Sequence, residues 1–539
     1  MKNILILSIV IIAMVIIGVS FFSESNETIE NSKTLYWNLV SEPETLDPQL
    51  NRTLDSGSVI NHMFEGLFRN FEGKLIPAIA TSYTVSSDQL TYTFKLRPAN
   101  WSDGSALSAH DFEFAWKRAL NPETASPYAY QLYYIKGGEA YHKGEGKASE
   151  VMVQALDDYT LEVVLESPTP YFLNLLSSFT FMPTKQSIVM SYPNGEWAHS
   201  PELSVSNGPY LLKSYTRGQN IILEKNPEYW NINAIKIDQI SASFIIDETT
   251  QLTAFENNEV DIIDAIPLQE IPRLLMESNN LFTLPSLGTY FFLFNTQTEP
   301  FDNADVRLAL SISIDRKAIV DLVSKGGEIP AYSMTPPGFY MNDGEDFNAL
   351  FKDHPIDPSK ANILEAQRLL AKAGYPDGKH FPEVEILFNT SESHKLLAEA
   401  IQQMWQDNLN IKVKLVSQEF AVFQENKSMG NFAIARGNWF ADYPDPMTML
   451  DIWTSNSKIN TTGWKNSNYD QLIHLAKKST GQQRIDLMLD AQRLLMKEAP
   501  ILPLYYYSDL ALISDRVVNW EKSCMGVWYF GNADIKEME

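Results

Sequence analysis

The sequence is poor in the residues and motifs that most enzymes use. Its single cysteine, Cys524, excludes an intrachain disulfide and any metal site built from several thiolates. It also lacks the H-E-x-x-H, G-x-S-x-G, G-x-x-x-x-G-K-[ST] and G-x-G-x-x-G motifs. The eight histidines are scattered, with no pair at the spacing of helical metal ligands. A hydrolase with two carboxylates among the 67 acidic residues stays open, because sequence alone does not show which carboxylates face each other.

Basic residues are also scarce. The chain has 42 lysines and arginines against 67 acidic residues, which gives a formal net charge of −25. Nucleic acid is therefore not an expected partner, because proteins that bind it carry a basic patch or stripe. With 44% hydrophobic and 12% aromatic residues, the chain is globular. At 539 residues it is too long for one core, and we expect two or three domains.

Charged residues are missing from residues 4 to 22, a run long enough to cross a bilayer. We interpret residues 1 to 33 as an export signal or membrane anchor followed by a polar tether, and expect the folded part to begin at Thr34. No A-x-A-like site follows the run, so both cleavage and retention of the segment stay open.

Hydrophobic periodicity predicts several strands and helices. Residues 90 to 97 and 161 to 167 alternate apolar and polar side chains, as half-buried strands do. A helix is predicted with Ser359 near its start and Gly374 at its end. Residues 383 to 416 read as strand, helix and strand, the pattern of a parallel crossover unit. The fold class is therefore α/β or mixed α+β, with several sheets.

The stretch RGNWFADYPDP, residues 436 to 446, predicts a short strand with an acidic residue at its end. Small and aromatic residues from Gly437 to Ala441 favour extended backbone, and Pro444 and Pro446 stop a strand because proline has no N–H to donate. Asp442 therefore lies at a strand end beside large rings. It is either a turn-forming residue or a fixed negative charge that awaits a cation.

Four separated blocks resemble the peptide-binding proteins of ABC importers: residues 99 to 129, 207 to 230, 294 to 319 and 435 to 446. The resemblance runs in order from about Thr34 to the C-terminus. It implies a periplasmic-binding-protein-like fold of two lobes with an additional domain. On that pattern domain I takes residues 34–64, 189–288 and 508–539, domain II takes residues 65–188, and domain III takes residues 289–507.

The family pattern also implies a peptide site. Members of the family hold an extended peptide between two protein strands by main-chain hydrogen bonds, a mode that reads backbone instead of sequence. The matching positions here run from Arg436 through Asn438 to Phe440 on one side, and Thr53 and Leu54 on the other. Without the resemblance, Phe440 would be assigned to the core.

Three further roles follow from the resemblance. Trp439 would help to close the site, although without the family pattern plain core packing is the favoured explanation. Asp442 would accept the terminal ammonium of the peptide. Carboxylate stations would be supplied by basic side chains, each of which alone reads as a solvated surface group: Arg436, His394 and Lys427. Pocket walls for the ligand's side chains would come from Tyr128, Asn460 and Thr461.

Together these features predict an exported receptor at the outer face of the bacterial cytoplasmic membrane. It would capture short peptides and deliver them to the permease subunits of an ABC importer, without catalysis, cofactor or metal. Lipid-anchored members carry a cysteine at the end of the signal, where this chain has Val19, so a lipid anchor is not expected. The alternatives are a narrower ligand, such as a murein or signalling peptide, and an exported hydrolase.

Overall fold

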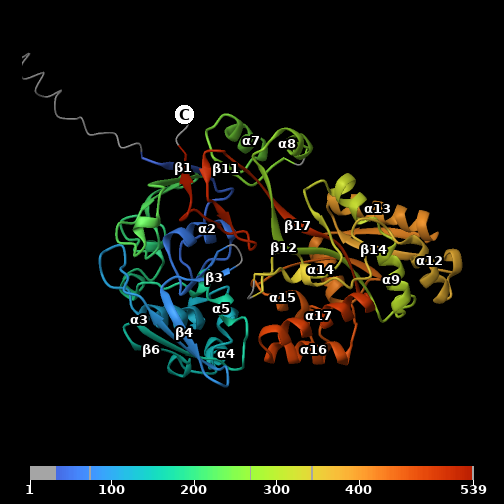
Figure 1. Ribbon diagram of the computed structural model, residues 1–539, viewed down its shortest axis with the longest axis horizontal. Helices are drawn as coiled ribbons and strands as arrows, with labels where there is room; N and C mark the ends of the chain where they lie inside the picture. Colours follow the sequence, from blue (N-terminus) through green and yellow to red (C-terminus); the bar gives the residue numbers. More distant parts are fainter. Residues whose placement is uncertain (1–31, 72–73, 268, 342–343, 537–539) are drawn as a thin grey trace, which may run out of the picture.

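The chain folds into two lobes, drawn mainly in blue to green and in yellow to orange (Figure 1). The computed structural model describes residues 32–71, 74–267, 269–341 and 344–536. The predicted signal or anchor falls almost wholly outside these ranges. Within them, no helix combines the length and apolar character that crossing a membrane requires.

One large sheet runs through both lobes. In the described residues it has eleven strands, ten of which follow in spatial order. They are β15 (Val413–Gln418), β14 (Val384–Asn389), β16 (Ile434–Phe440), β12 (Leu281–Phe294), β17 (Ile501–Ile513), β11 (Ile262–Ile263), β1 (Thr34–Asn38), β10 (Gln239–Ser243), β9 (Asn220–Lys225) and β8 (Tyr210–Thr216). The eleventh, β13 (Ile329–Pro330), pairs with β17. The first five strands of this order lie in or lead into one lobe, and the last five build the other.

Strands β12 and β17 connect the lobes (Figure 1). They pair antiparallel in blocks, and the register shifts between Pro285 and Thr289 and again between Tyr290 and Phe291. Such irregularities bend a strand pair and increase its local twist. After β17 the chain returns to the first lobe, where a guanidinium nitrogen of Arg516 donates to Asp261 at 2.7 Å. The two lobes are therefore joined by paired strands with an irregular middle.

A separate small sheet forms the lower part of the first lobe (Figure 1). Its strands follow in the order β4 (Ala80–Val85), β5 (Thr91–Leu96), β7 (Thr160–Val164) and β6 (Val153–Asp157). Helix α3 (Ala109–Leu120) packs against this sheet with Phe112 and Trp116 fully buried. Strands β5 and β7 confirm the two alternating segments predicted from the sequence.

The predicted crossover unit is confirmed in the second lobe. β14 and β15 are parallel, and helix α13 (Glu392–Leu409) connects them and buries Trp405. Helix α12 (Ile363–Lys372) begins later than predicted because Asn362, not Ser359, accepts the backbone N–H of Glu365 at the helix start.

The remaining helices used below come from both lobes. They are α2 (Leu54–Met63), α5 (Phe172–Leu175), α7 (Glu248–Glu256), α8 (Ile271–Glu277), α9 (Ala304–Ile312), α14 (Phe420–Met429), α15 (Met447–Leu450), α16 (Ser467–Lys478) and α17 (Gly481–Glu498). One apolar core around Trp405 fills the β14–α13–β15 unit. A larger one continues from the first lobe into α15, α16 and α17, so the lobes share buried side chains.

Candidate functional site

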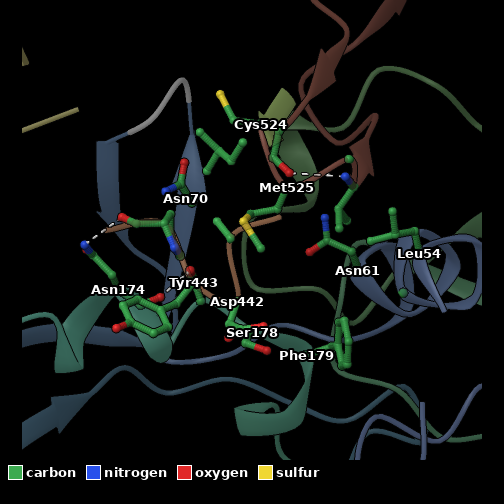
Figure 2. A pocket seen from close by; sticks show the side chains of 18 of the residues that line it. Leu54, Asn61, Asn70, Asn174, Ser178, Phe179, Asp442, Tyr443, Cys524 and Met525 are labelled. Atoms are coloured by element: carbon green, nitrogen blue, oxygen red, sulfur yellow. Dashed lines mark hydrogen bonds between the residues drawn. The ribbon is translucent and has the colours of Figure 1, made fainter. Parts of the chain in front are cut away.

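A cavity of about 380 Å³ lies between the two lobes. Its walls come from the start of α2, from α5 and the segment after it, from β12, from the segment that follows β16, and from the C-terminal hairpin β19 (Glu521–Lys522) and β20 (Trp528–Tyr529). Figure 2 shows amide side chains such as Asn61 and Asn174 facing this space together with apolar ones such as Phe179 and Met525. The lining is mixed, which suits a ligand with both polar and apolar parts.

The first-lobe wall includes Thr53 and Leu54. Thr53 is the N-cap of α2, and its hydroxyl oxygen accepts the backbone N–H of Ser56 at 3.3 Å. The resemblance implied a strand at Thr53 and Leu54, but the structure has none there. The backbone is extended only at Thr53 and is helical from Leu54 onward. Leu54 is 54% exposed at the cavity wall.

Strand β16 leads into the second-lobe wall of the cavity, to which it contributes its last residue, Phe440. Residues from Arg436 to Phe440 pair antiparallel with the stretch of β12 from Phe292 to Gly288. On the other side of β16, the pairing with β14 involves only Ile434 and Ala435. Among the described strands, none covers the outer edge of β16 beyond Ala435. That edge leaves main-chain groups available for another extended chain.

Asp442 lies two positions after Phe440, the last residue of β16 and of this open edge. Its backbone N–H donates to the hydroxyl of Thr448 at 3.1 Å, but its carboxylate forms no hydrogen bond or ion pair with any described residue. The carboxylate is accessible from the cavity. The pKa of Asp442 lies above its usual value because the surrounding protein excludes water and because Asp451 is near. The site therefore holds a disfavoured negative charge that a cation would stabilise.

Three basic side chains gather at the other end of the open edge. Arg436 is buried, with its guanidinium carbon 5.1 Å from the centre of the Tyr290 ring. The Tyr290 hydroxyl lies 3.3 Å from Nδ1 of His394. Burial and the charge of Arg436 lower the pKa of His394 to about 4 and that of Lys427 to about 8.

This basic cluster has no balancing acid. None of Arg436, His394 and Lys427 forms an ion pair with a described carboxylate, and Nε of Arg436 is buried without a hydrogen-bond partner there. Burial is the main cause of the lowered pKa values of His394 and Lys427, and the charge of Arg436 adds to it. Near neutral pH, His394 is neutral and offers a hydrogen bond instead of a charge.

The predicted site residues thus fall into three groups. Those that line the cavity are Thr53, Leu54, Tyr128, Phe440 and Asp442. The basic cluster of Arg436, His394 and Lys427 is not part of the cavity lining. The remaining four also lie away from the lining: Asn438, Trp439, Asn460 and Thr461.

Contacts of this last group are mainly structural. The indole N–H of Trp439 donates to the carbonyl of Thr448 at 3.0 Å, which supports the segment carrying Asp442. The amide nitrogen of Asn460 donates to the carbonyls of Trp453 and Trp464 at 3.1 and 3.0 Å, and thereby holds its own loop.

Sequence reasoning missed several cavity residues. Asn174, Ser178 and Phe179 come from the small domain, by which we mean the part of the first lobe that holds the small sheet and α5, and Cys524 and Met525 come from the C-terminal hairpin. No motif marks these residues, since they meet only through the tertiary fold. In the described ranges, no group of three or more His, Cys, Asp or Glu side chains is placed to hold a metal ion.

Residues 74–461 match the family model of bacterial extracellular solute-binding proteins, family 5 middle. The chain belongs to this family of solute-binding proteins. One relative is the dipeptide-binding protein DppE of Bacillus subtilis, 35% identical over 499 residues that cover 92% of this chain and 90% of DppE.

Two solved structures superpose on this chain to different degrees. The unliganded open form of the periplasmic murein tripeptide-binding protein MppA matches with a TM-score of 0.85 and 31% identity, covering 94% of this chain and 97% of MppA. OppA of Haemophilus influenzae in complex with the peptide RPPGFSPFR matches with a TM-score of 0.68 and 31% identity, covering 94% and 99%. The lobes of this family 5 protein are thus arranged more as in the open form.

Proposed function

We propose that this protein captures short peptides outside the cytoplasm and delivers them to the membrane subunits of an ABC importer. The observation that carries the proposal is the open edge of β16, with the carboxylate of Asp442 at one end and the basic cluster at the other. A short peptide has the complementary pattern, because its main-chain hydrogen-bonding groups lie between an ammonium and a carboxylate. Pairing with the edge would add the peptide as an extra strand.

In this arrangement the ammonium of the peptide meets Asp442. Its carboxylate meets Arg436, whose planar guanidinium binds a carboxylate with two hydrogen bonds, or it meets His394 or Lys427. Arg436 and Asp442 are six positions apart, which corresponds to about 20 Å along an extended strand. A span of that size suits a peptide of a few residues. Several stations along it would serve peptides of different lengths.

Four further residues have a supporting role in this proposal: Trp439, Asn438, Asn460 and Thr461. Trp439 holds the segment that carries Asp442, and the extended backbone at Asn438 is part of the open edge. Asn460 and Thr461 would reach a ligand only if their loop moved on closure. Tyr128 and the apolar wall around it would accommodate the ligand's side chains.

We also propose the division into a discontinuous domain I (residues 34–64, 189–288 and 508–539), domain II (65–188) and domain III (289–507). The boundaries near 288 and 507 fall close to the irregular middle of the β12–β17 pair, and the small sheet lies within domain II. The better match to an open structure supports a hinge at this place and closure around the ligand.

The proposed location is the outer face of the bacterial cytoplasmic membrane, with residues 1 to 33 as signal or anchor and the permease subunits as partners. Family members are binding proteins, and we propose that this chain catalyses no reaction. A narrower ligand is the second candidate, because the murein tripeptide-binding protein MppA superposes well.

Native mass spectrometry of the purified protein tests the proposal. We expect a ladder of masses that correspond to mixed short peptides, which disappears after partial unfolding and dialysis and returns when a peptide mixture is added. A single retained mass would favour the narrower ligand. Failure to bind any component of a di- to pentapeptide mixture would contradict the proposal, and shortening of the added peptides would indicate a hydrolase.

A further inference from the structure

The segment that carries Asp442 is in direct contact with the small domain of the first lobe. The rings of Tyr443 and Tyr171 are stacked, with centroids 4.8 Å apart and planes inclined by 12°. Next to Tyr443, the carbonyl of Pro444 accepts a hydrogen bond from the side chain of Asn174 at 3.3 Å, drawn as a dashed line in Figure 2. Both partners come from α5 or the residue before it.

The same segment is also held by contacts within the second lobe. Asp445 and Arg484 of α17 form a buried ion pair with two hydrogen bonds of 2.6 and 2.9 Å. The backbone N–H of Met447 also donates to Asp445 at 2.9 Å. Since the guanidinium carbon of Arg484 lies 5.9 Å from the centre of the Tyr171 ring, the two sets of contacts adjoin.

The contact between the domains is a packed one. Tyr171 and Tyr443 are 5% and 9% exposed, and both belong to the apolar core that continues from the first lobe into α15 and α17. It is present in an arrangement of the lobes that superposes better on an unliganded open structure than on a peptide complex. The contact therefore does not depend on a bound ligand.

We propose that Tyr171 and Asn174 are positioning residues that hold the Asp442 segment in its binding geometry before the ligand arrives. The ammonium station is then a composite of the second lobe, which supplies the carboxylate, and the small domain, which fixes its backbone. A segment ordered in advance saves the entropy cost of ordering it during binding. This inference rests on the proposed role of Asp442 as the acceptor of the peptide ammonium.

The test compares trialanine with N-acetyl-trialanine by calorimetry in the wild type and four variants. In Tyr171→Leu, which removes the stacked ring, and in Asn174→Ala, which removes the hydrogen bond, we expect the preference for the free amine to fall by about tenfold. Tyr171→Phe keeps the stack and should preserve the preference. Tyr133→Leu is the matched control, because this ring of the same domain contacts His142 instead of the segment.

A second measurement needs no ligand. Amide hydrogen exchange over residues 440 to 449 should be at least severalfold faster in Tyr171→Leu than in the wild type, and unchanged in Tyr171→Phe. An unaltered amine preference in both Tyr171→Leu and Asn174→Ala, with unaltered exchange, would overturn the inference. Peptide binding by the wild type without any preference for the free amine would instead refute the role of Asp442, and absence of binding would refute the proposed function itself.

Discussion

Asp442 combines a cost to the folded protein with the role in binding that we propose for it. Its carboxylate has no cation among the described residues, and the pKa of Asp442 is raised by exclusion of water and by Asp451. An ionised group in that situation destabilises the ligand-free fold. A ligand ammonium would favour the ionised form of this carboxylate, so we expect binding of a cation to lower the pKa of Asp442.

Replacement of Asp442 should therefore stabilise the empty protein while weakening binding. The folded pKa lies above the unfolded one, so the stability linked to the bound proton is complete below the unfolded pKa and is lost as pH rises through the folded pKa. Asp442→Asn should raise the urea midpoint at pH 7 and leave it unchanged near pH 3. A lower midpoint at pH 7 would show that the carboxylate instead has a stabilising partner.

Lys427 makes a separate prediction about protons. Its pKa is lowered to about 8 by burial and by Arg436, so at pH 8.5 the side chain is mainly neutral in the empty protein. A peptide carboxylate would raise that pKa, and binding should take up roughly half a proton. Calorimetry in buffers of different ionisation enthalpy measures this uptake.

The measurement uses an N-acetylated peptide, because a free α-amino group also titrates near pH 8. The uptake should vanish in Lys427→Met and when the C-terminus of the acetylated peptide is also amidated. Equal uptake by the acetylated peptide with and without the amide would assign the proton to another group. His394 contributes little to this measurement, because its pKa of about 4 keeps it neutral well below pH 8.5.

The elements show where sequence patterns suffice. Strand β16 was predicted in part from its small and aromatic residues, although it begins earlier, at Ile434, and ends at Phe440, before the prolines. The β14–α13–β15 unit was predictable from its changing period. The helix start at Leu54 was missed because the family pattern implied a strand there, although Thr53 and Ser56 form a local cap. Local hydrogen bonds decided that boundary, and a coarse resemblance does not resolve them.

Contact between β12 and β16 provides the element-scale prediction. A Cβ added at Gly288 would lie 2.5 Å from the Phe440 ring and 3.0 Å from that of Tyr507, too close for either ring to stay in place. Gly288→Ala should destabilise the protein by about 1–3 kcal/mol and move the Phe440 ring at the cavity wall. Urea unfolding measures the loss.

Phe440→Leu provides the control, because a smaller side chain leaves room for the new methyl group. Adding Gly288→Ala to the Phe440→Leu variant should therefore cost much less stability than adding it to the wild type. If the loss in the double variant equals the sum of the two single losses, the strain lies elsewhere, in the backbone of β12.

At the scale of the whole molecule, the decisive contacts join parts of the chain that are far apart in sequence. Asn174 and Pro444 are separated by 270 positions, and β12 pairs with β17 across the segment that forms the second lobe. Periodicity and turn signals carry no information about such pairs. The resemblance placed Asp442 and the basic residues in one site, but their protonation and the support from the small domain emerged only from the packed structure.

Two opposite charges at the ends of one open strand edge are the centre of this account. The most direct test is calorimetry with four forms of one tripeptide: free, N-acetylated, C-amidated and capped at both ends. The account predicts that each cap weakens binding by roughly ten- to a hundredfold, since each removes one charged hydrogen-bonded pair, and that the doubly capped form binds most weakly. Equal affinity for all four forms would contradict it.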